Sequence, residues 1–248
     1  MEIALLAFFA VGYFVLAGAD LGVGMLLPYL GRTPEERGRV LGSITPFFLT
    51  NEVWLVTAVG VLIGAFPVLE GEMFSGLYLP FAALLLGWVA RDAGIWLRGR
   101  VDRAAWRAWC EGAVVAGSWL AVLSWGLILV GMGDGFTVGF GALVAAPLGA
   151  VLFAAHGLAL AGLRLDGAPL ERARRFAGPA AGRTVYALTS GGMALVCLLA
   201  GARLPLAEHL ADPATLALLT PSMLLLTPLL VASQVWLWWL FGRVQVRQ

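Results

Sequence analysis

The chain has no lysine, because all sixteen basic residues among its 248 are arginine. This absence excludes a retinal protein, since the retinal Schiff base forms on a lysine side chain. Charge is also scarce, at 12% of residues, and the net charge is only +1, so nothing indicates a nucleic-acid partner. A soluble domain carries about 25% charged residues, so this composition is that of a membrane protein.

Cysteine and histidine are nearly as scarce, which limits metal chemistry. Cys110 and Cys197 are too far apart in the sequence to suggest a metal site, and no disulfide framework is indicated. A haem held by two histidines needs both inside the membrane, and only His156 lies in an apolar segment, because His209 falls in a loop. No P-loop or nucleophile elbow is present. We therefore expect this chain to bind no haem or metal itself, while a bound quinone or lipid stays open.

Hydrophobic residues make up 60% of the chain, and the mean hydropathy is +0.89. A membrane-spanning helix needs about 20 mostly apolar residues. We expect an all-α integral membrane protein with about seven transmembrane helices. It would form a single membrane domain over residues 1–248, with a first four-helix bundle over 1–131 and a shortened second half over 132–248. The expected spans are Ile3–Leu30, Ile44–Phe66, Phe74–Leu97, Gly112–Gly131, Phe136–Leu163, Val185–Gly201 and Leu216–Phe241. The first run is too long for the core of a signal peptide, so we expect a retained helix.

The arginines predict the orientation of the bundle. All of them except Arg203 lie in, or border, the same set of alternate loops, and these include Arg243 and Arg247 at the end of the chain. The opposite loops carry acids instead, such as Glu70 and Asp134. Because cytoplasmic loops are enriched in arginine and lysine, the N-terminus is expected outside and the C-terminus in the cytoplasm of a bacterial cell.

Six polar residues lie in or at the edge of the apolar runs: Asp20, Asn51, Glu52, Arg91, Glu111 and His156. Asp20, Glu52 and Arg91 lie about 10, 8 and 6 residues from the cytoplasmic ends of their spans, or roughly 15, 12 and 9 Å at 1.5 Å per residue. The three side chains should therefore lie in one layer of the membrane. An ionisable residue inside a membrane needs a partner or a function.

Two interpretations of this layer stay open. A chain of titratable groups leading inward from the cytoplasm is the composition expected of a proton path. Alternatively, Arg91 forms an ion pair with Glu52 or Asp20 that only fixes helix packing. Taken alone, Glu111 is interpreted as an acid at a helix start and His156 as a hydrogen-bonded interior histidine. Gly18 and Gly22 flank Asp20 and predict close approach of another helix.

Several segments of the chain form an ordered series. The first is Gly18-Ala-Asp20-Leu-Gly-Val-Gly-Met25. It is followed by Asn51-Glu-Val-Trp54-Leu55, Ala65-Phe-Pro67 and Phe74-Ser-Gly-Leu-Tyr78-Leu-Pro80. Arg91, Glu111, His156-Gly157 and the ending from Trp236 to Val244 continue the series. In this order, the segments resemble subunit II of the cytochrome bd-type quinol oxidases.

The resemblance implies a non-haem subunit that pairs with a haem-bearing subunit I. That complex oxidises quinol and reduces oxygen to water, and haems b and d would lie in the partner. Trp54 would line an oxygen route, and the acids would serve proton delivery. Membrane lipids and a small accessory subunit are further expected partners. A proton-coupled transporter that works without a haem partner is the alternative.

The sequence also departs from the family pattern. The family usually has Trp-Asp-Gly before Asn-Glu-Val-Trp, and this chain has Phe48-Leu49-Thr50. Leu49 therefore replaces an aspartate and cannot titrate. Ala17 stands where family members frequently have an acid. Family members are also longer by about two helices, and this chain lacks that material between Gly201 and Leu216.

Overall fold

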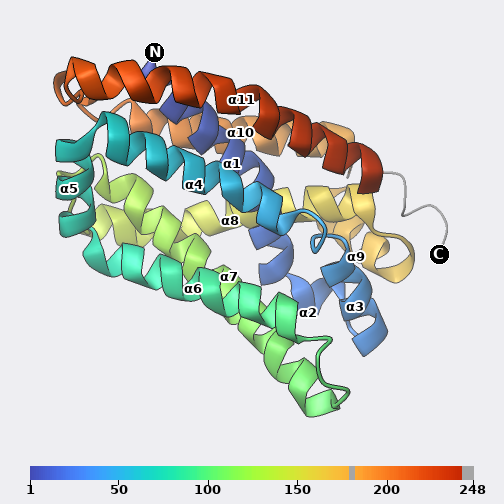
Figure 1. The fold of residues 1–248 in the computed structure, drawn as a ribbon. Helices are drawn as coiled ribbons and strands as arrows, with labels where there is room; N and C mark the ends of the chain where they lie inside the picture. The colour runs from blue at the N-terminus through green and yellow to red at the C-terminus, as the bar shows by residue number, and fades with distance from the viewer. Residues whose placement is uncertain (179–181, 242–248) are drawn as a thin grey trace.

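The structure, a computed structural model, describes residues 1–178 and 182–241, and in these residues it contains helices and turns but no strand (Figure 1). Within the described ranges, seven helices are long and apolar enough to cross a membrane. They are α1 (Glu2–Met25), α4 (Phe48–Ala65), α6 (Tyr78–Leu97), α7 (Ala104–Gly131), α8 (Phe140–Arg164), α10 (Arg183–Gly201) and α11 (Pro213–Phe241). This confirms the expected all-helical membrane fold. The orientation of the termini stays a prediction, and Arg243 and Arg247 lie outside the described residues.

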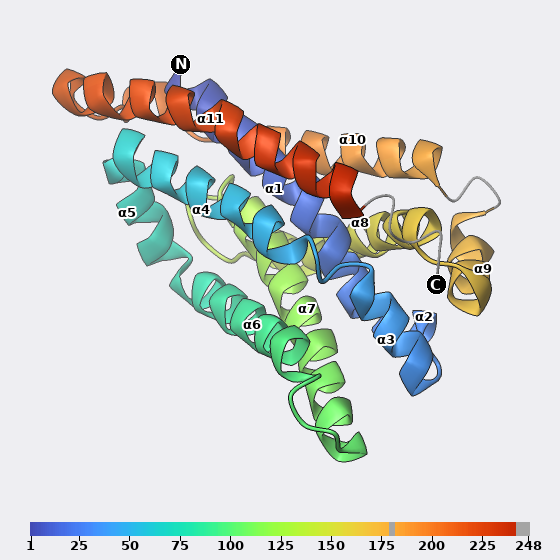
Figure 2. The ribbon, with the colours of Figure 1, turned by 45° about the vertical axis from the view of Figure 1, so that its right-hand side comes forward.

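Helix α1 lies at the centre of the bundle and packs against α4, α7, α8 and α10. The α6–α7 hairpin lies on one side of α1, while α10 and α11 lie on the other (Figures 1 and 2). Helices α1 and α8 cross at a very short distance. A Cβ atom on Gly22 would lie 2.0 Å from the carbonyl oxygen of Phe153, and one on Gly157 would lie 2.3 Å from the carbonyl carbon of Gly22. The prediction of a close helix approach beside Asp20 is therefore confirmed.

Short helices occupy the ends of the bundle, and the apolar runs predict none of them as a separate helix. They are α2 (Leu27–Leu30), α3 (Pro34–Gly42), α5 (Pro67–Gly76) and α9 (Gly167–Ala177). The expected span Ile3–Leu30 is wrong in one respect, because the helix ends at Met25 and α2 follows it. Pro28 explains the break, since its ring excludes the carbonyl group four residues earlier and it has no N–H to donate. Helix α3 begins with a capping box between Thr33 and Glu36.

These boundaries change the expected depths, but not the expected layer. Asp20 lies five residues before Met25, the last residue of α1. Glu52 lies four residues after Phe48, the first residue of α4. Both acids are therefore closer to a helix end than the sequence suggested, and by a similar amount, so they still share one level.

Candidate functional site

Asp20 ends a chain of hydrogen bonds that joins three helices. Asn51 Nδ2 of α4 donates to Asp20 Oδ2 at 2.7 Å. Gln234 Nε2 of α11 donates to Asn51 Oδ1 at 2.8 Å, and the Trp54 indole N–H donates to Gln234 Oε1 at 3.2 Å. All four side chains are buried. Each donor in this series points toward the carboxylate, so the amide dipoles favour negative charge on Asp20.

A second group forms around Arg91, which is 1% exposed. Its NH1 lies 3.2 Å from Glu52 Oε1 and 3.7 Å from Asp92 Oδ1. The Phe48 ring lies 5.7 Å from the guanidinium carbon, within the range of a cation–π contact. Of the two ion pairs that the sequence left open for Arg91, the structure contains the one with Glu52.

Glu111 belongs to neither group. Its carboxylate binds Arg37 Nε at 2.7 Å and Arg98 NH2 at 2.8 Å, near the end of the bundle that carries α3. The interpretation as an acid at a helix start is wrong, because α7 begins at Ala104 and Glu111 lies two turns inside it. The first turns of α7 lie outside the expected span because Arg107 within them and Arg103 directly before them lower the local hydropathy.

His156 also lies apart from the acids. Its Nδ1 is 2.7 Å from the Thr189 hydroxyl, its Nε2 is 2.8 Å from the Val15 carbonyl oxygen, and its ring stacks on Tyr186 at 4.8 Å. The interpretation as a hydrogen-bonded interior histidine is confirmed. Both ring nitrogens are engaged, so His156 in this conformation has no free lone pair for iron. In the described part of the chain, no three His, Cys, Asp or Glu residues are placed to hold a metal ion.

Trp54 lies against the N-terminal half of α1. Its ring contacts Phe8 and Phe9 with centroids 5.3 and 5.9 Å apart, and it packs over Gly12, where a Cβ would lie 2.0 Å from the indole. A nearby apolar cavity of about 500 Å³ is lined by α1, α4, α7 and α10, with Tyr13 and Trp125 among its walls. Its lining suits a hydrophobic guest such as a lipid chain, a quinone tail or a dissolved apolar gas.

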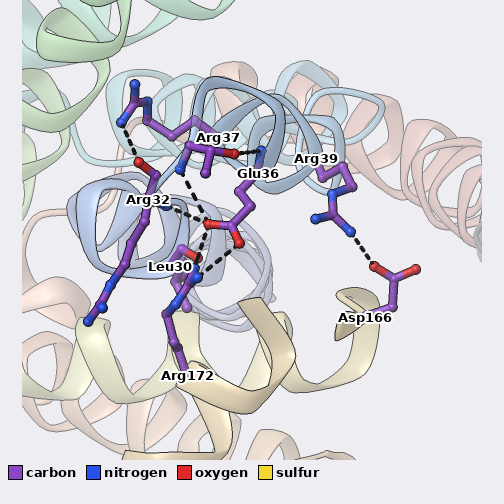
Figure 3. A network of polar contacts seen from close by, with 8 residues as sticks. Leu30, Arg32, Glu36, Arg37, Arg39, Asp166 and Arg172 are labelled. Atoms are coloured by element: carbon purple, nitrogen blue, oxygen red, sulfur yellow. Dashed lines mark hydrogen bonds and ion pairs between the residues drawn. The ribbon is translucent and has the colours of Figure 1, made fainter. Parts of the chain in front are cut away.

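A network at the α3 end of the bundle joins distant parts of the chain (Figure 3). Glu36 accepts hydrogen bonds from Arg172 NH1 and NH2 at 2.8 and 2.9 Å, and from the backbone N–H of Arg32 at 2.7 Å. The Arg172 guanidinium lowers the pKa of the Glu36 carboxyl to about 2. Arg39 NH1 lies 3.1 Å from Asp166 beside it. These contacts fasten α3 to α9 and do not reach the intramembrane acids.

The sequence-predicted set therefore separates into four places. The structure brings together Asp20 with Asn51, and Glu52 with Arg91, while Glu111 and His156 lie elsewhere. Sequence reasoning missed Asp92 and Gln234. Asp92 could have been found as a second acid next to a buried arginine, whereas an uncharged glutamine inside an apolar run gives almost no signal.

Comparisons with known proteins match this chain to one family. Residues 1–205 match the family model described as "Cytochrome bd terminal oxidase subunit II". "Cytochrome bd ubiquinol oxidase subunit 2" of Bacillus subtilis (strain 168) is 42% identical over 102 residues, which are 41% of this chain and 30% of that protein. "Cytochrome bd-I ubiquinol oxidase subunit 2" of Escherichia coli (strain K12) is 35% identical over 113 residues, or 46% of this chain and 30% of that protein. "Probable cytochrome oxidase subunit 2" of Haemophilus influenzae is 32% identical over 117 residues, or 47% and 31% of the two chains.

Each aligned region spans less than a third of the relative's own length. The family match covers α1 to α10 together with Asp20, Glu52 and Arg91, whereas α11 and Gln234 lie beyond it. Because this match extends over most of the chain, the chain belongs to the cytochrome bd terminal oxidase subunit II family.

Proposed function

We propose that the chain is the non-haem subunit II of a cytochrome bd-type quinol oxidase in a bacterial cytoplasmic membrane. It stabilises a haem-bearing subunit I and supports quinol oxidation and the reduction of oxygen to water. The carrying observation is the buried ionic layer of Asp20, Glu52 and Arg91, which lies on three helices within the region that matches the family. Buried charges in a membrane are costly, so a layer of them indicates a function.

In this proposal Asp20 and Glu52 carry protons toward the partner's haems, and Arg91 supplies their counter-charge. The Asn51 amide holds one oxygen of Asp20 at 2.7 Å and leaves the other for a proton. Trp54 contributes to the wall of an oxygen route, which is consistent with its apolar surroundings beside α1. Haems b and d belong to subunit I.

Purification of this chain from its native membrane tests the assignment. Haem absorbance and quinol oxidase activity should co-purify with it. A homo-oligomer without haem that moves protons together with a solute would contradict the proposal and support a transporter.

The role of Asp20 needs a separate test. Asp20→Asn keeps the size of the side chain and removes its titration, so oxygen consumption should slow at unchanged haem content. Asp134→Asn, in an exposed loop, is the matched control and should leave the rate unchanged. Loss of haem and of the partner subunit in Asp20→Asn would show instead that Asp20 only stabilises the assembly.

A further inference from the structure

The group around Arg91 contains two carboxyl groups and one guanidinium. Glu52 Oε1 and Asp92 Oδ1 approach the same guanidinium nitrogen, at 3.2 and 3.7 Å. Arg91 Nε and NH2, and also Asp92 Oδ1, are buried without a hydrogen-bond partner. The two carboxyl groups therefore share one guanidinium nitrogen, and much of the hydrogen-bonding capacity of Arg91 is unused.

The charges of these three groups indicate that the two carboxyl groups retain a proton. One guanidinium can neutralise one carboxylate, and a second carboxylate beside it would leave a net negative charge inside the bundle. Such a charge is costly in a medium of low dielectric constant, and two close carboxyl groups that cannot both ionise retain one proton between them. The proton then belongs to the pair and not to either residue.

Among the residues that the structure describes, no second cation contacts the pair. The Phe48 ring covers the guanidinium from α4. From α1, Asp20 and Tyr13 face the group within electrostatic range, and neither is positively charged at neutral pH. Asp20 adds negative potential where it is ionised, which strengthens the tendency of the pair to keep its proton.

The two acids differ in their access to the outside. The Asp92 side chain is 21% exposed, and the Glu52 side chain is 8% exposed. A proton that arrives from the edge of the bundle therefore reaches Asp92 first and Glu52 second. Arg91 NH1 contacts both side chains and can hold whichever carboxylate is left ionised.

We propose that Glu52 and Asp92 form a carboxylate pair that holds one exchangeable proton beside Arg91, with Asp92 as the member that exchanges it with the outside. The pair itself is a property of this chain. Its use as a loading point for protons that Glu52 passes inward rests on the proposed function.

Infrared spectroscopy of the full chain in lipid nanodiscs tests the pair without measuring oxidase activity. The parent chain carries Asp20→Asn, so that Asp20 contributes no signal. At neutral pH this chain should show the carbonyl stretch of a protonated carboxylic acid, shifted in D2O. Glu52→Gln alone and Asp92→Asn alone should each abolish the band. In either variant the remaining carboxyl group is the only partner of Arg91 in the pair, so it is ionised. Glu72→Gln, at an exposed position, should leave the band unchanged.

Isotope labelling makes the same test in the parent chain, without a substitution at the pair. Carboxyl-¹³C labelling of aspartate alone, or of glutamate alone, should each shift part of the band. Absence of the band in the parent chain, its survival in either variant, or its complete shift by one label would overturn the shared proton. These outcomes are independent of whether the chain supports quinol oxidation, so failure of the pair and failure of the proposed function are distinguishable.

Discussion

Replacement of Gln234 by leucine should loosen α11 from the bundle. The change removes the hydrogen bond to Asn51 Oδ1 at 2.8 Å and the one from the Trp54 indole at 3.2 Å. At an average of about 0.6 kcal/mol per side-chain hydrogen bond inside a membrane, the loss is about 1.2 kcal/mol. A buried polar group left without a hydrogen-bond partner, such as Asn51 Oδ1 or the Trp54 indole N–H, costs about 1–3 kcal/mol of stability. We therefore expect the free energy of unfolding to fall by about 1–3 kcal/mol in total.

Reversible unfolding in mixed micelles measures this loss, and the same helix offers a matched control. The Ser233 hydroxyl donates to the Leu230 carbonyl oxygen within α11 itself, so Ser233→Ala should change the free energy of unfolding by less than about 0.5 kcal/mol. A double-mutant cycle of Gln234→Leu with Asn51→Leu should give a coupling of about 0.6 kcal/mol. A zero coupling energy, or a loss no larger than that of Ser233→Ala, would refute the hydrogen-bonded chain.

Two further predictions concern the helix crossing and the network at the α3 end. Gly22→Ala places a Cβ 2.0 Å from a backbone oxygen of α8, so thermal unfolding should show a loss of about 1–3 kcal/mol, while Gly60→Ala, which meets nothing within 4 Å, should be nearly neutral. Glu36 has a pKa lowered from 4.5 to about 2 by Arg172, so its contribution to stability is complete above pH 4.5 and is lost as the pH falls toward 2. The difference in melting temperature between the unchanged chain and Glu36→Gln should therefore shrink between pH 6 and pH 2, and a difference that is constant over this range would contradict the assigned role of the ion pair.

The seven spanning helices were predictable because lipid leaves the backbone no partner except itself. A run of about 20 apolar residues then has essentially one conformation available. Arg91 and Glu52 were predictable as partners, since depth along each helix follows from residue number. The short helices were not predictable in this way, because α3 and α9 are polar and their stability comes from contacts such as Glu36 with Arg172.

Which side chains contact one another in the site was harder to predict, for a different reason. Residue number gives the depth of a side chain but not the direction it faces around the helix axis in the assembled bundle. His156 and Asp20 both lie inside the membrane, yet His156 faces Thr189 of α10 and Asp20 faces Asn51 of α4. Gln234 joins the Asp20 chain only because α11 packs beside α4, which hydropathy does not specify.

Within this chain, α11 presents a single buried residue, Gln234, and its other contacts include the Thr220 hydroxyl bound to Glu2. Partly buried apolar side chains such as Leu219 and Trp238 also pack α11 against the bundle. The hydrogen bonds of Gln234 differ from these contacts because they are strong only while water is absent, since water can replace either partner. Entry of water beside Asn51 would therefore free the amide that holds Asp20 and loosen α11 in the same event. Hydration of this small region would in this way couple the position of an entire transmembrane helix to the charge of one carboxylate.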